Sequence, residues 1–380
     1  MDFIRLLDLA SILEKRTAFL FGARGTGKTT LITAQLGTAR VYDLLEEKTY
    51  LRLLRDSAVL EQENPSENAL IVIDEIQKLP KLLDEVQRLI TKKKHRFLLT
   101  GSSARKLKRE GANLLGGRAR ELHLFPLTWK EIGSGPFDLL KFLNQGGLPA
   151  IYQSDEPIED LKGYLSLYLR EEVAAEALTR RMDQFARFLD TMALNNGEEL
   201  NYEGIASDVG MKARTLMNYV EILEDTLLGF RVHPFEKTLK RKAITRAKFF
   251  LFDLGVTAAL ARRGRITEGS ELFGKAFEHF IALELRAAIS YSRADLPLHY
   301  WRTKTGFEVD FVIGTQTAIE VKATHFVTEK HLKGLRALRT ENLIKNYFLI
   351  SQEPHERLID GIRVIPWQKA LEELWSGQWF

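Results

Sequence analysis

Residues 22–29 have the composition of a loop that binds phosphate. They read Gly-Ala-Arg-Gly-Thr-Gly-Lys-Thr, and the glycines let backbone N–H groups wrap around phosphate oxygens. We expect the Lys28 ammonium to reach the β and γ phosphates of ATP, and the Thr29 hydroxyl to help hold Mg²⁺. An apolar run at 17–21 suits a buried strand before the loop, and residues 29–36 suit a helix whose N-terminus favours anions. The predicted nucleotide-binding residues are Gly22, Gly25, Thr26, Gly27, Lys28, Thr29 and Thr30.

Two adjacent acids follow a second apolar run. Residues 70–75 read Leu-Ile-Val-Ile-Asp-Glu, which is typical of a central parallel strand that ends in carboxylates. We expect Asp74 to hold Mg²⁺ through water and Glu75 to polarise the water that attacks the γ phosphate. A third strand at 97–100 leads into Gly101 and Ser102, where Thr100 or Ser102 could face the γ phosphate as a polar sensor. The pair of acids predicts hydrolysis of the nucleotide, with Ser102 assigned to the catalytic set.

A second group of acids lies near the C-terminus. Residues 307–313 alternate as a strand that contains Asp310, and residues 318–323 form another that contains Glu320 and Lys322. Side chains two residues apart share one face of a strand, so Glu320 and Lys322 should point the same way. Carboxylates for a divalent cation and a nearby ammonium suit phosphodiester hydrolysis. An ordinary strand surface with one salt bridge is the alternative.

Residues 201–233 have the pattern of a helix-turn-helix. Apolar residues recur at helical spacing on both sides of Gly210, which breaks the helix. Strands at 228–232 and 247–252 could form a wing, with a basic segment between them. If the unit binds DNA, the exposed residues of the second helix enter the groove or touch the backbone. These residues are Lys212, Arg214, Thr215 and Asn218. Helix-turn-helix units also serve as packing or dimerisation modules, which is the alternative.

Composition limits the setting in which these residues work. The chain has 380 residues, enough for two or three domains, and 45% of them are hydrophobic. No apolar run approaches the roughly 20 residues that cross a bilayer, so we expect no membrane partner. The chain has no cysteine, which excludes disulfides and fits a cytoplasmic location. A net charge of +4 indicates a modest preference for polyanions.

The first 150 residues resemble the AAA+ ATPases, and within them a prokaryotic group whose C-terminal half is a domain of formerly unknown function. The resemblance rests on the phosphate loop, the 74–80 stretch, the Thr-Gly-Ser-Ser at 100–103, the 115–118 and 125–127 segments and the Gly-Gly-Leu-Pro at 146–149. It implies a homo-oligomer arranged as a ring, in which an arginine from the next subunit stabilises charge on the transferred phosphoryl group. Arg118 is the candidate, with Arg120 second. A solvated Arg118 beside a flexible glycine pair is the alternative.

The C-terminal acids resemble the PD-(D/E)XK nuclease superfamily. The resemblance rests on Asp310 and the Glu320-x-Lys322 pattern, with Glu278 on a preceding helix at 274–290. It implies that Asp310 and Glu320 ligate Mg²⁺, or Mn²⁺, and that Lys322 orients or activates water. Glu278 would supply a further acid to the metal site.

These patterns together predict an α/β protein of three parts. We expect a AAA+ P-loop domain at 1–137, a helical lid with a winged helix-turn-helix at 138–235, and a restriction-nuclease-like α/β domain at 236–380. The predicted function is ATP-dependent binding and processing of DNA, with ATP turnover coupled to the nuclease-like domain. The alternative is a nucleotide-gated switch whose C-terminal domain is catalytically silent and binds DNA or protein.

Overall fold

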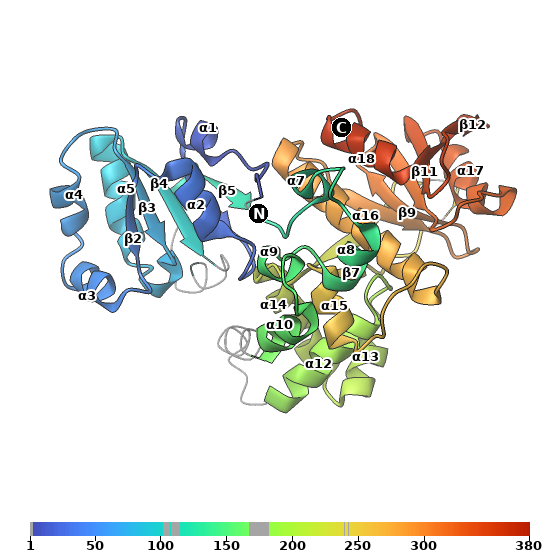
Figure 1. Cartoon of the computed structure of the whole chain (residues 1–380), viewed down its shortest axis with the longest axis horizontal. Helices are drawn as coiled ribbons and strands as arrows, with labels where there is room; N and C mark the ends of the chain where they lie inside the picture. Colours follow the sequence, from blue (N-terminus) through green and yellow to red (C-terminus); the bar gives the residue numbers. More distant parts are fainter. Residues whose placement is uncertain (1–2, 102–106, 108–114, 167–181, 239, 242) are drawn as a thin grey trace. The chain divides into compact units, whose positions relative to one another are not determined.

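The computed structural model describes residues 3–101, 107, 115–166, 182–238, 240–241 and 243–380 (Figure 1). Its contacts divide the chain into two compact units. The N-terminal unit comprises residues 5–126 with the short segment 225–228, and the C-terminal unit comprises mainly residues 127–224 and 229–380. In the part of the chain that the structure describes, no helix has the length and apolar character needed to cross a membrane.

The N-terminal unit contains a sheet of five strands that all run parallel. The sheet order is β2-β3-β4-β1-β5. The strands are β1 (Thr17–Phe21), β2 (Arg40–Asp43), β3 (Leu70–Asp74), β4 (Arg96–Gly101) and β5 (Ala119–His123). All five residues of β1 are buried, as expected for a central strand of a parallel sheet covered on both faces. The prediction of a parallel α/β domain around the phosphate loop is confirmed.

Helices cover this sheet, and the alternation of side chains sets the face that each helix meets. Phe19, Ile71 and Phe97 share one core with Val86 and Leu89 of α5. Helix α5 carries acids in its first turn and lysines in its last turn, which complements the helix dipole. The helices are α1 (Leu9–Leu13), α2 (Lys28–Leu36), α3 (Glu47–Arg55), α4 (Val59–Glu63) and α5 (Leu82–Lys93), with 3-10 turns η1 (Ile76–Lys78) and η2 (Leu115–Gly117).

The C-terminal unit is built on a mixed sheet of eight strands, in the order β12-β13-β11-β10-β9-β8-β6-β7. The strands are β6 (Gly229–Pro234), β7 (Lys248–Leu251), β8 (Leu298–Arg302), β9 (Glu308–Ile313), β10 (Thr317–Val321), β11 (Asn346–Ser351), β12 (Arg357–Ile359) and β13 (Ile362–Pro366). The two strands predicted as a wing pair antiparallel, with Phe230 opposite Phe250. Strand β6 also pairs with β8, so the two strands form one end of the larger sheet. The predicted boundary at 235/236 therefore falls at the end of a strand of this sheet.

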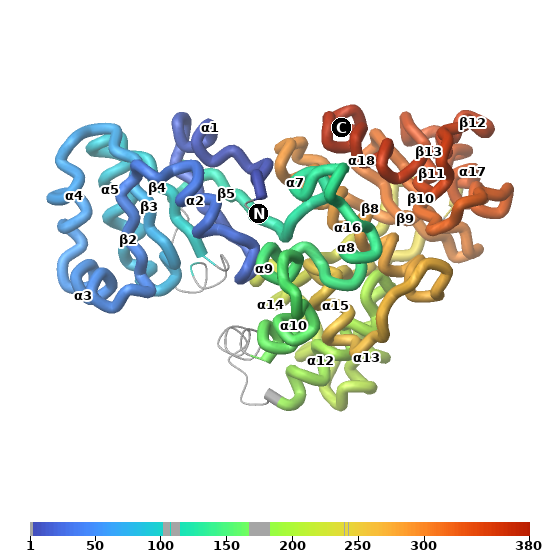
Figure 2. Tube along the Cα trace, viewed as in Figure 1, coloured from blue at the N-terminus to red at the C-terminus, as the bar shows by residue number. Residues whose placement is uncertain are grey.

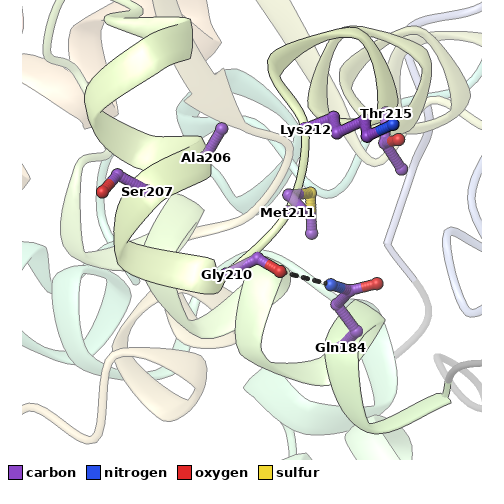
Figure 3. A pocket seen from close by; sticks show the side chains of 7 residues that line it. All are labelled: Gln184, Ala206, Ser207, Gly210, Met211, Lys212 and Thr215. Carbon is purple, nitrogen blue, oxygen red and sulfur yellow. Dashed lines mark hydrogen bonds between the residues drawn. The ribbon is translucent and has the colours of Figure 1, made fainter.

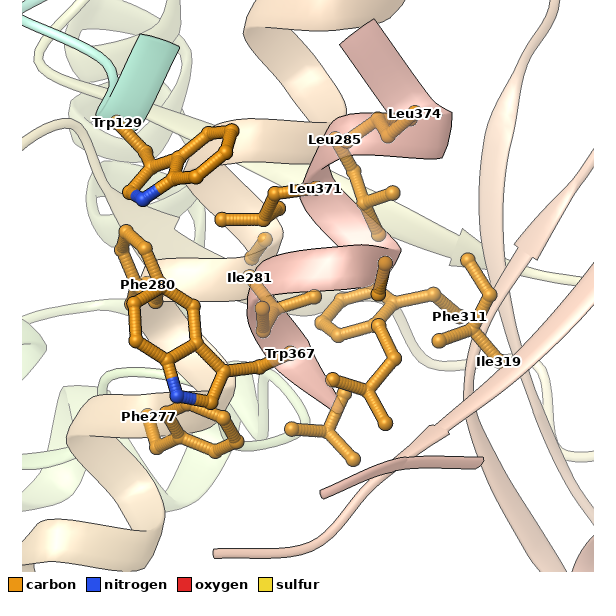
Figure 4. Close-up of a cluster of buried hydrophobic side chains, with 14 of the residues drawn as sticks. Trp129, Phe277, Phe280, Ile281, Leu285, Phe311, Ile319, Trp367, Leu371 and Leu374 are labelled. Carbon is orange, nitrogen blue, oxygen red and sulfur yellow. The ribbon is translucent and has the colours of Figure 1, made fainter. Parts of the chain in front are cut away.

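The main core of this unit lies between the sheet and helices α16 and α18 (Figure 4). Helix α16 buries Phe277, Phe280 and Ile281 at the spacing of one helix face, and they meet Trp367 of α18 and Phe311 of β9. The helices of the unit are α7 (Trp129–Ile132), α8 (Leu139–Gln145), α9 (Pro149–Tyr152), α10 (Pro157–Tyr164), α12 (Met182–Leu194), α13 (Tyr202–Val209), α14 (Ala213–Asp225), α15 (Leu254–Leu260), α16 (Glu271–Ser292), η4 (Glu329–Leu332), α17 (Lys333–Arg339) and α18 (Trp367–Trp375).

Part of the predicted lid packs inside the C-terminal unit. Helix α8 contacts α15 and α16 (Figure 2). Its Phe142 side chain belongs to the main core. Hydrogen bonds to the buried Asp253 carboxylate fix the turn after α8, and we call this contact the latch. The Asp253 carboxylate accepts hydrogen bonds from Gly147 N at 2.7 Å and Val256 N at 2.9 Å, and burial raises its pKa to about 6. A Cβ atom on Gly146 would lie 2.2 Å from Asp253 Oδ1, so only glycine fits there.

Candidate functional site

The phosphate loop connects the carboxyl end of β1 to the first turn of α2. Gly25 and Gly27 have φ angles of 81° and 91°, a region that side chains rarely adopt. A Cβ atom on Gly22 would lie 2.7 Å from Leu124 O. Thr29 and Thr30 are exposed in the first turn of α2, at the helix end that attracts anions. The glycines are therefore required by backbone geometry, and the loop leaves its exposed side open to phosphate.

Side chains inside and outside the loop hold it in shape. Lys28 Nζ donates to Gly22 O at 2.7 Å, and Thr26 Oγ1 donates to Ala23 O at 2.8 Å. Arg5 holds the loop from outside: its Nη1 donates a hydrogen bond to Thr26 O at 2.5 Å, and its Nη2 donates one to Phe125 O at 2.6 Å. Arg5 was not predicted from the sequence, because a single arginine far from the motif carries no local signal.

Strand β4 lies between β1 and β3 and carries the residue that organises the two acids. Thr100 is fully buried, donates its hydroxyl proton to Asp74 Oδ1 and accepts from Glu75 N at 3.2 Å. It therefore positions the acids, and the prediction that Thr100 or Ser102 senses the γ phosphate stays a prediction. Ser102 lies outside the described residues. Asp74 and Glu75 are both half-buried at the carboxyl end of β3.

Glu75 has a backbone conformation that a non-glycine residue seldom adopts. Its φ and ψ angles are 58° and 45°, in the left-handed region. Such strain costs of order 1–3 kcal/mol and concentrates at functional sites. The Gln77 amide donates to Glu75 Oε2, and a Cβ atom on Gly101 would lie 2.4 Å from Gln77 Oε1. Gln77 therefore holds the Glu75 carboxylate, a role that was not predicted from the sequence.

Arg118 lies at the amino ends of the parallel strands, whereas the phosphate loop of its own chain lies at their carboxyl ends. The parallel register pairs Thr17 with Ala119 and Phe21 with His123, so Arg118 stands beside the amino end of β1. The loop follows the carboxyl end of that strand, about 16 Å away along the five residues of β1. Arg118 is exposed and lies far from the phosphate loop of its own chain.

The C-terminal acids meet where strands β9 and β10 separate. Their antiparallel pairing ends at Phe311 opposite Ile319, and Asp310 Oδ2 then accepts the Val321 N–H at 2.8 Å. The β8–β9 ladder changes register at this point, with Asp310 and Phe311 both opposite Tyr300. A bulge of this kind re-aims a side chain. It sets the direction of Asp310, which strict alternation could not have predicted.

Glu320 and Lys322 share a face, as the alternation predicted. Lys322 Nζ lies 2.6 Å from Glu320 Oε1 and 3.7 Å from Asp310 Oδ2. Burial and the charge of Asp310 raise the pKa of Glu320 well above its usual value. Burial alone would lower the pKa of Lys322, but the two carboxylates raise it. Glu320 Oε2 is buried and has no hydrogen-bond partner within the described part of the chain.

Glu278 is paired with a lysine that was not predicted from the sequence. Lys248 of β7 is 4% exposed, and its Nζ lies 3.2 Å from Glu278 Oε1 and 2.7 Å from Glu308 Oε1. Burial raises the pKa of Glu278 to about 7, although Lys248 opposes the shift. Among the described residues, no group of three or more Asp, Glu or His residues is arranged to hold a metal ion. The structure thus brings Asp310, Glu320 and Lys322 together and leaves Glu278 bound to Lys248.

The predicted helix-turn-helix is present as α13 and α14. Asn201 caps α13, Gly210 ends it in the left-handed conformation, and α14 starts at Ala213. Phe185 and Phe188 of α12 pack on Tyr219, with ring centroids 5.1 and 5.3 Å away. Of the predicted DNA-binding residues, Lys212, Arg214 and Asn218 are exposed and Thr215 is half-buried.

A pocket of about 380 Å³ lies at the turn between α13 and α14 (Figure 3). Lys212 and Thr215 line it together with Met211 from the turn and Gln184 from α12. The Gln184 amide donates to Gly210 O at 2.8 Å and fixes the turn against α12. Helix α12 therefore holds the turn. The start of α14 stays accessible, because Lys212 and Arg214 are exposed.

Three family models match successive parts of the chain. Residues 14–133 match the family described as AAA domain. Residues 137–266 match a domain of unknown function (DUF8612), and residues 273–370 match another (DUF4143). The first match falls on the N-terminal unit, and its phosphate loop and parallel sheet agree with the AAA+ P-loop domain expected there.

Curated relatives match most of the chain at low identity. An uncharacterized protein of Mycobacterium tuberculosis is 25% identical over 317 residues, covering 80% of this chain and 70% of its own. An uncharacterized protein of Haemophilus influenzae is 24% identical over 334 residues, covering 81% and 79%. One from Methanocaldococcus jannaschii is 23% identical over 403 residues, covering 94% and 88%.

Solved structures match more distantly. The Aeropyrum pernix ORC1 protein in complex with DNA has a TM-score of 0.23 and 14% identity, and the match covers 65% of this chain and 86% of that one. A STAND protein with a tetratricopeptide repeat sensor from Pyrococcus horikoshii has a TM-score of 0.22 and 16% identity, covering 73% and 44%. Similarity at this level carries no argument about the fold or function of this chain.

Proposed function

We propose that this protein hydrolyses ATP in its AAA+ domain and uses that turnover to process DNA at the carboxylate site of its C-terminal unit. The observation that carries the proposal is the meeting of Asp310, Glu320 and Lys322 around a buried carboxylate oxygen that has no partner within the described residues. Burying such an oxygen is costly unless a cation or a donor satisfies it.

In the AAA+ domain, each residue of the site has a defined role in the proposal. Lys28 exchanges its bonds to loop carbonyls for the β and γ phosphates, and Thr29 and Asp74 hold Mg²⁺. Glu75 polarises the attacking water, and its carboxylate is already oriented by Gln77. A Mg²⁺ ion held by these residues would neutralise the charge that develops on the phosphates.

The exposed position of Arg118 supports a homo-oligomer, which we propose closes into a ring. Its place at the amino edge of the sheet favours action on the nucleotide of a neighbouring subunit. An arginine supplied in this way stabilises the charge on the transferred phosphoryl group. Each ATP site is then incomplete in a single chain.

At the C-terminal site, Asp310 and Glu320 fit a Mg²⁺ or Mn²⁺ ion. They are hard oxygen donors, and the unpartnered Glu320 Oε2 is available. A bound ion would supply positive charge at the phosphorus and a more acidic water. Lys322 positions that water. Glu278 does not fit as a ligand, because Lys248 holds its carboxylate.

The start of α14 is the DNA contact in this proposal. Lys212 is exposed in the turn before α14 and Arg214 in its first turn, and α14 packs on α12, which is the placement expected of residues that meet a phosphate backbone.

A second candidate is a nucleotide-gated switch with a catalytically silent C-terminal domain that binds DNA or protein. It is favoured by the pairing of the acids with ammonium groups, because Lys248 already binds Glu278 and Glu308. In this alternative the carboxylates maintain the fold and bind no metal.

The experiment that separates the two candidates uses the full chain with single-stranded, duplex and branched DNA, with and without ATP and Mg²⁺ or Mn²⁺. Asp310→Asn and Glu320→Gln should lose both metal binding, measured by calorimetry, and DNA cleavage. Lys322→Ala should keep the metal and lose cleavage. Glu75→Gln should keep ATP binding but hydrolyse ATP about 10²–10⁴-fold more slowly, and Lys28→Ala should lose ATP binding.

Glu271→Gln is the matched control for the carboxylate variants, because Glu271 is exposed on α16. It should behave like the unmutated protein in every assay. Absence of metal binding and of cleavage on all DNA forms, with ATP turnover intact, would reject the nuclease and favour the switch.

A further inference from the structure

An exposed aromatic ring stands close to the C-terminal carboxylate site. Phe326 is 74% exposed, and among the described residues it is the one phenylalanine in the group of exposed large hydrophobic residues. It follows Lys322 by four residues, so the two Cα atoms are at most about 14 Å apart. Lys322 in turn contacts Glu320. A large apolar ring in water beside a charged site is a candidate contact surface.

The loop that carries Phe326 is fixed on both sides of the ring. Val327 is 3% exposed, and its N–H donates to Glu353 Oε1 at 2.5 Å. Arg357 Nη2 donates to Val327 O at 2.8 Å. On the other side, Phe326 N donates to Thr324 Oγ1 at 3.1 Å. The anchored backbone presents the ring to solvent in a defined place.

The surroundings of this ring are positively charged. Between residues 322 and 336 the chain has four lysines and arginines and a single acid, Glu329. Arg336 pairs with Glu329 at 2.5 Å and with Asp360 at 2.6 Å, so its charge is shared between two acids. Lys330 and Lys333 are exposed. A partner here must therefore combine negative charge with a flat apolar face.

Single-stranded DNA has both features, because its phosphates attract lysines and its bases stack on aromatic rings. Paired bases in a duplex are already stacked and cannot cover the ring. We propose that Phe326 stacks on a base of single-stranded DNA whose backbone enters the carboxylate site beside Lys322. This inference rests on the proposed function, to which it adds the form of the substrate.

The test measures binding of fluorescent oligo-dT to the full chain with EDTA and without ATP, so that it depends on neither cleavage nor turnover. Phe326→Ala should weaken binding roughly 5- to 150-fold, the range expected when one base no longer stacks on an aromatic ring. Phe326→Trp should restore it. Leu358→Ala is the matched control, because Leu358 is 69% exposed on β12 of the same unit and should have no effect.

An oligonucleotide with abasic sites supplies the second comparison. Phe326→Ala should bind it as the unmutated protein does, because there is no base to stack. Equal binding of oligo-dT by Phe326→Ala and the unmutated protein overturns the inference, as does Phe326-dependent binding to phosphatidylserine vesicles in place of DNA. Phe326-dependent DNA binding without any cleavage supports the stacking role and rejects only the nuclease.

Discussion

The phosphate loop and the C-terminal carboxylate site both suit phosphate chemistry, but they are built in different ways. The loop uses backbone geometry, with Gly25 and Gly27 in the left-handed region and Lys28 bonded to carbonyl oxygens. The C-terminal site uses side chains, and each of its lysines contacts two carboxylates. The loop is held in shape by hydrogen bonds to backbone carbonyls, whereas the charged side chains of the C-terminal site form ion pairs with one another. Variants that remove one charge should therefore have different effects in the two regions.

The largest expected effect is on the nucleotide site. Arg118→Ala should lower ATP turnover about 10³–10⁵-fold, the range for an arginine that completes a phosphoryl-transfer site, while ATP binding is unchanged. Mixing this variant with Lys28→Ala should restore part of the turnover, because some interfaces then contain both residues. Steady-state ATPase assays of each protein and of the mixture measure this. If Arg120→Ala shows the larger loss, or if assembled mixtures show no rescue, Arg118 is not a trans-acting arginine.

The C-terminal site should respond with a loss of stability. Lys248→Met removes a buried ammonium from between the partly buried carboxylates of Glu278 and Glu308, and we expect the free energy of unfolding to fall by about 3–5 kcal/mol. Urea titrations followed by tryptophan fluorescence measure this change. Lys275→Met is the control, since its ion pair with Glu198 is half exposed and is worth about 0–1 kcal/mol. If Lys28→Met lowered the free energy of unfolding by the same amount, the phosphate loop and the C-terminal site would not differ in how they respond to the loss of one charge.

Glu284 is a buried acid whose carboxylate is bound by N–H donors from two tryptophans, Trp129 and Trp375, both at 2.7 Å. Burial raises its pKa to about 8. Between pH 4.5 and 8 the unfolded chain therefore releases a proton that the folded chain keeps, so stability falls as pH rises, by roughly 1.4 kcal/mol per pH unit.

Glu284→Gln should remove this part of the pH dependence, which urea unfolding of both proteins at pH 7 and 8 would measure. Burial lowers the pKa of His279 to about 4, so above pH 6.5 that group is neutral in both states and does not contribute. Identical pH slopes in the two proteins would mean that Glu284 is ionised in the folded state.

The smallest expected effect concerns the helix-turn-helix. Lys212→Ala with Arg214→Ala should weaken duplex DNA binding and reduce the log-log slope of affinity against salt by about 0.9 for each phosphate that the protein no longer neutralises. Anisotropy titrations at several salt concentrations measure the slope. Lys162→Ala, which removes an exposed lysine on α10, is the control. Superimposable curves for the double variant and the unmutated protein would make the motif a packing element.

The same contrast explains which features were predictable from the sequence. Residues 17–21 and 70–74 form strands as predicted, because an apolar run and its flanking glycines or acids are local signals. The direction of Asp310 depends on a bulge opposite Tyr300, and the roles of Arg5 and Lys248 depend on contacts between distant segments. Local patterns contain no information about such contacts. The joining of the predicted wing to the eight-stranded sheet was missed for the same reason, since it depends on pairing between β6 and β8.

The latch between the Gly146 turn and Asp253 has a consequence for synthesis of the chain. The bond from Gly147 N to Asp253 spans 106 residues, so a ribosome needs roughly 5–20 s after making the turn before its partner exists. During that time Phe142 and the rest of α8 lack α15 and α16, which cover them in the folded unit. The five-stranded sheet is already complete by His123. The nascent chain thus displays a completed five-stranded sheet followed by an uncovered apolar helix, which exposes it to aggregation and to chaperones during that interval.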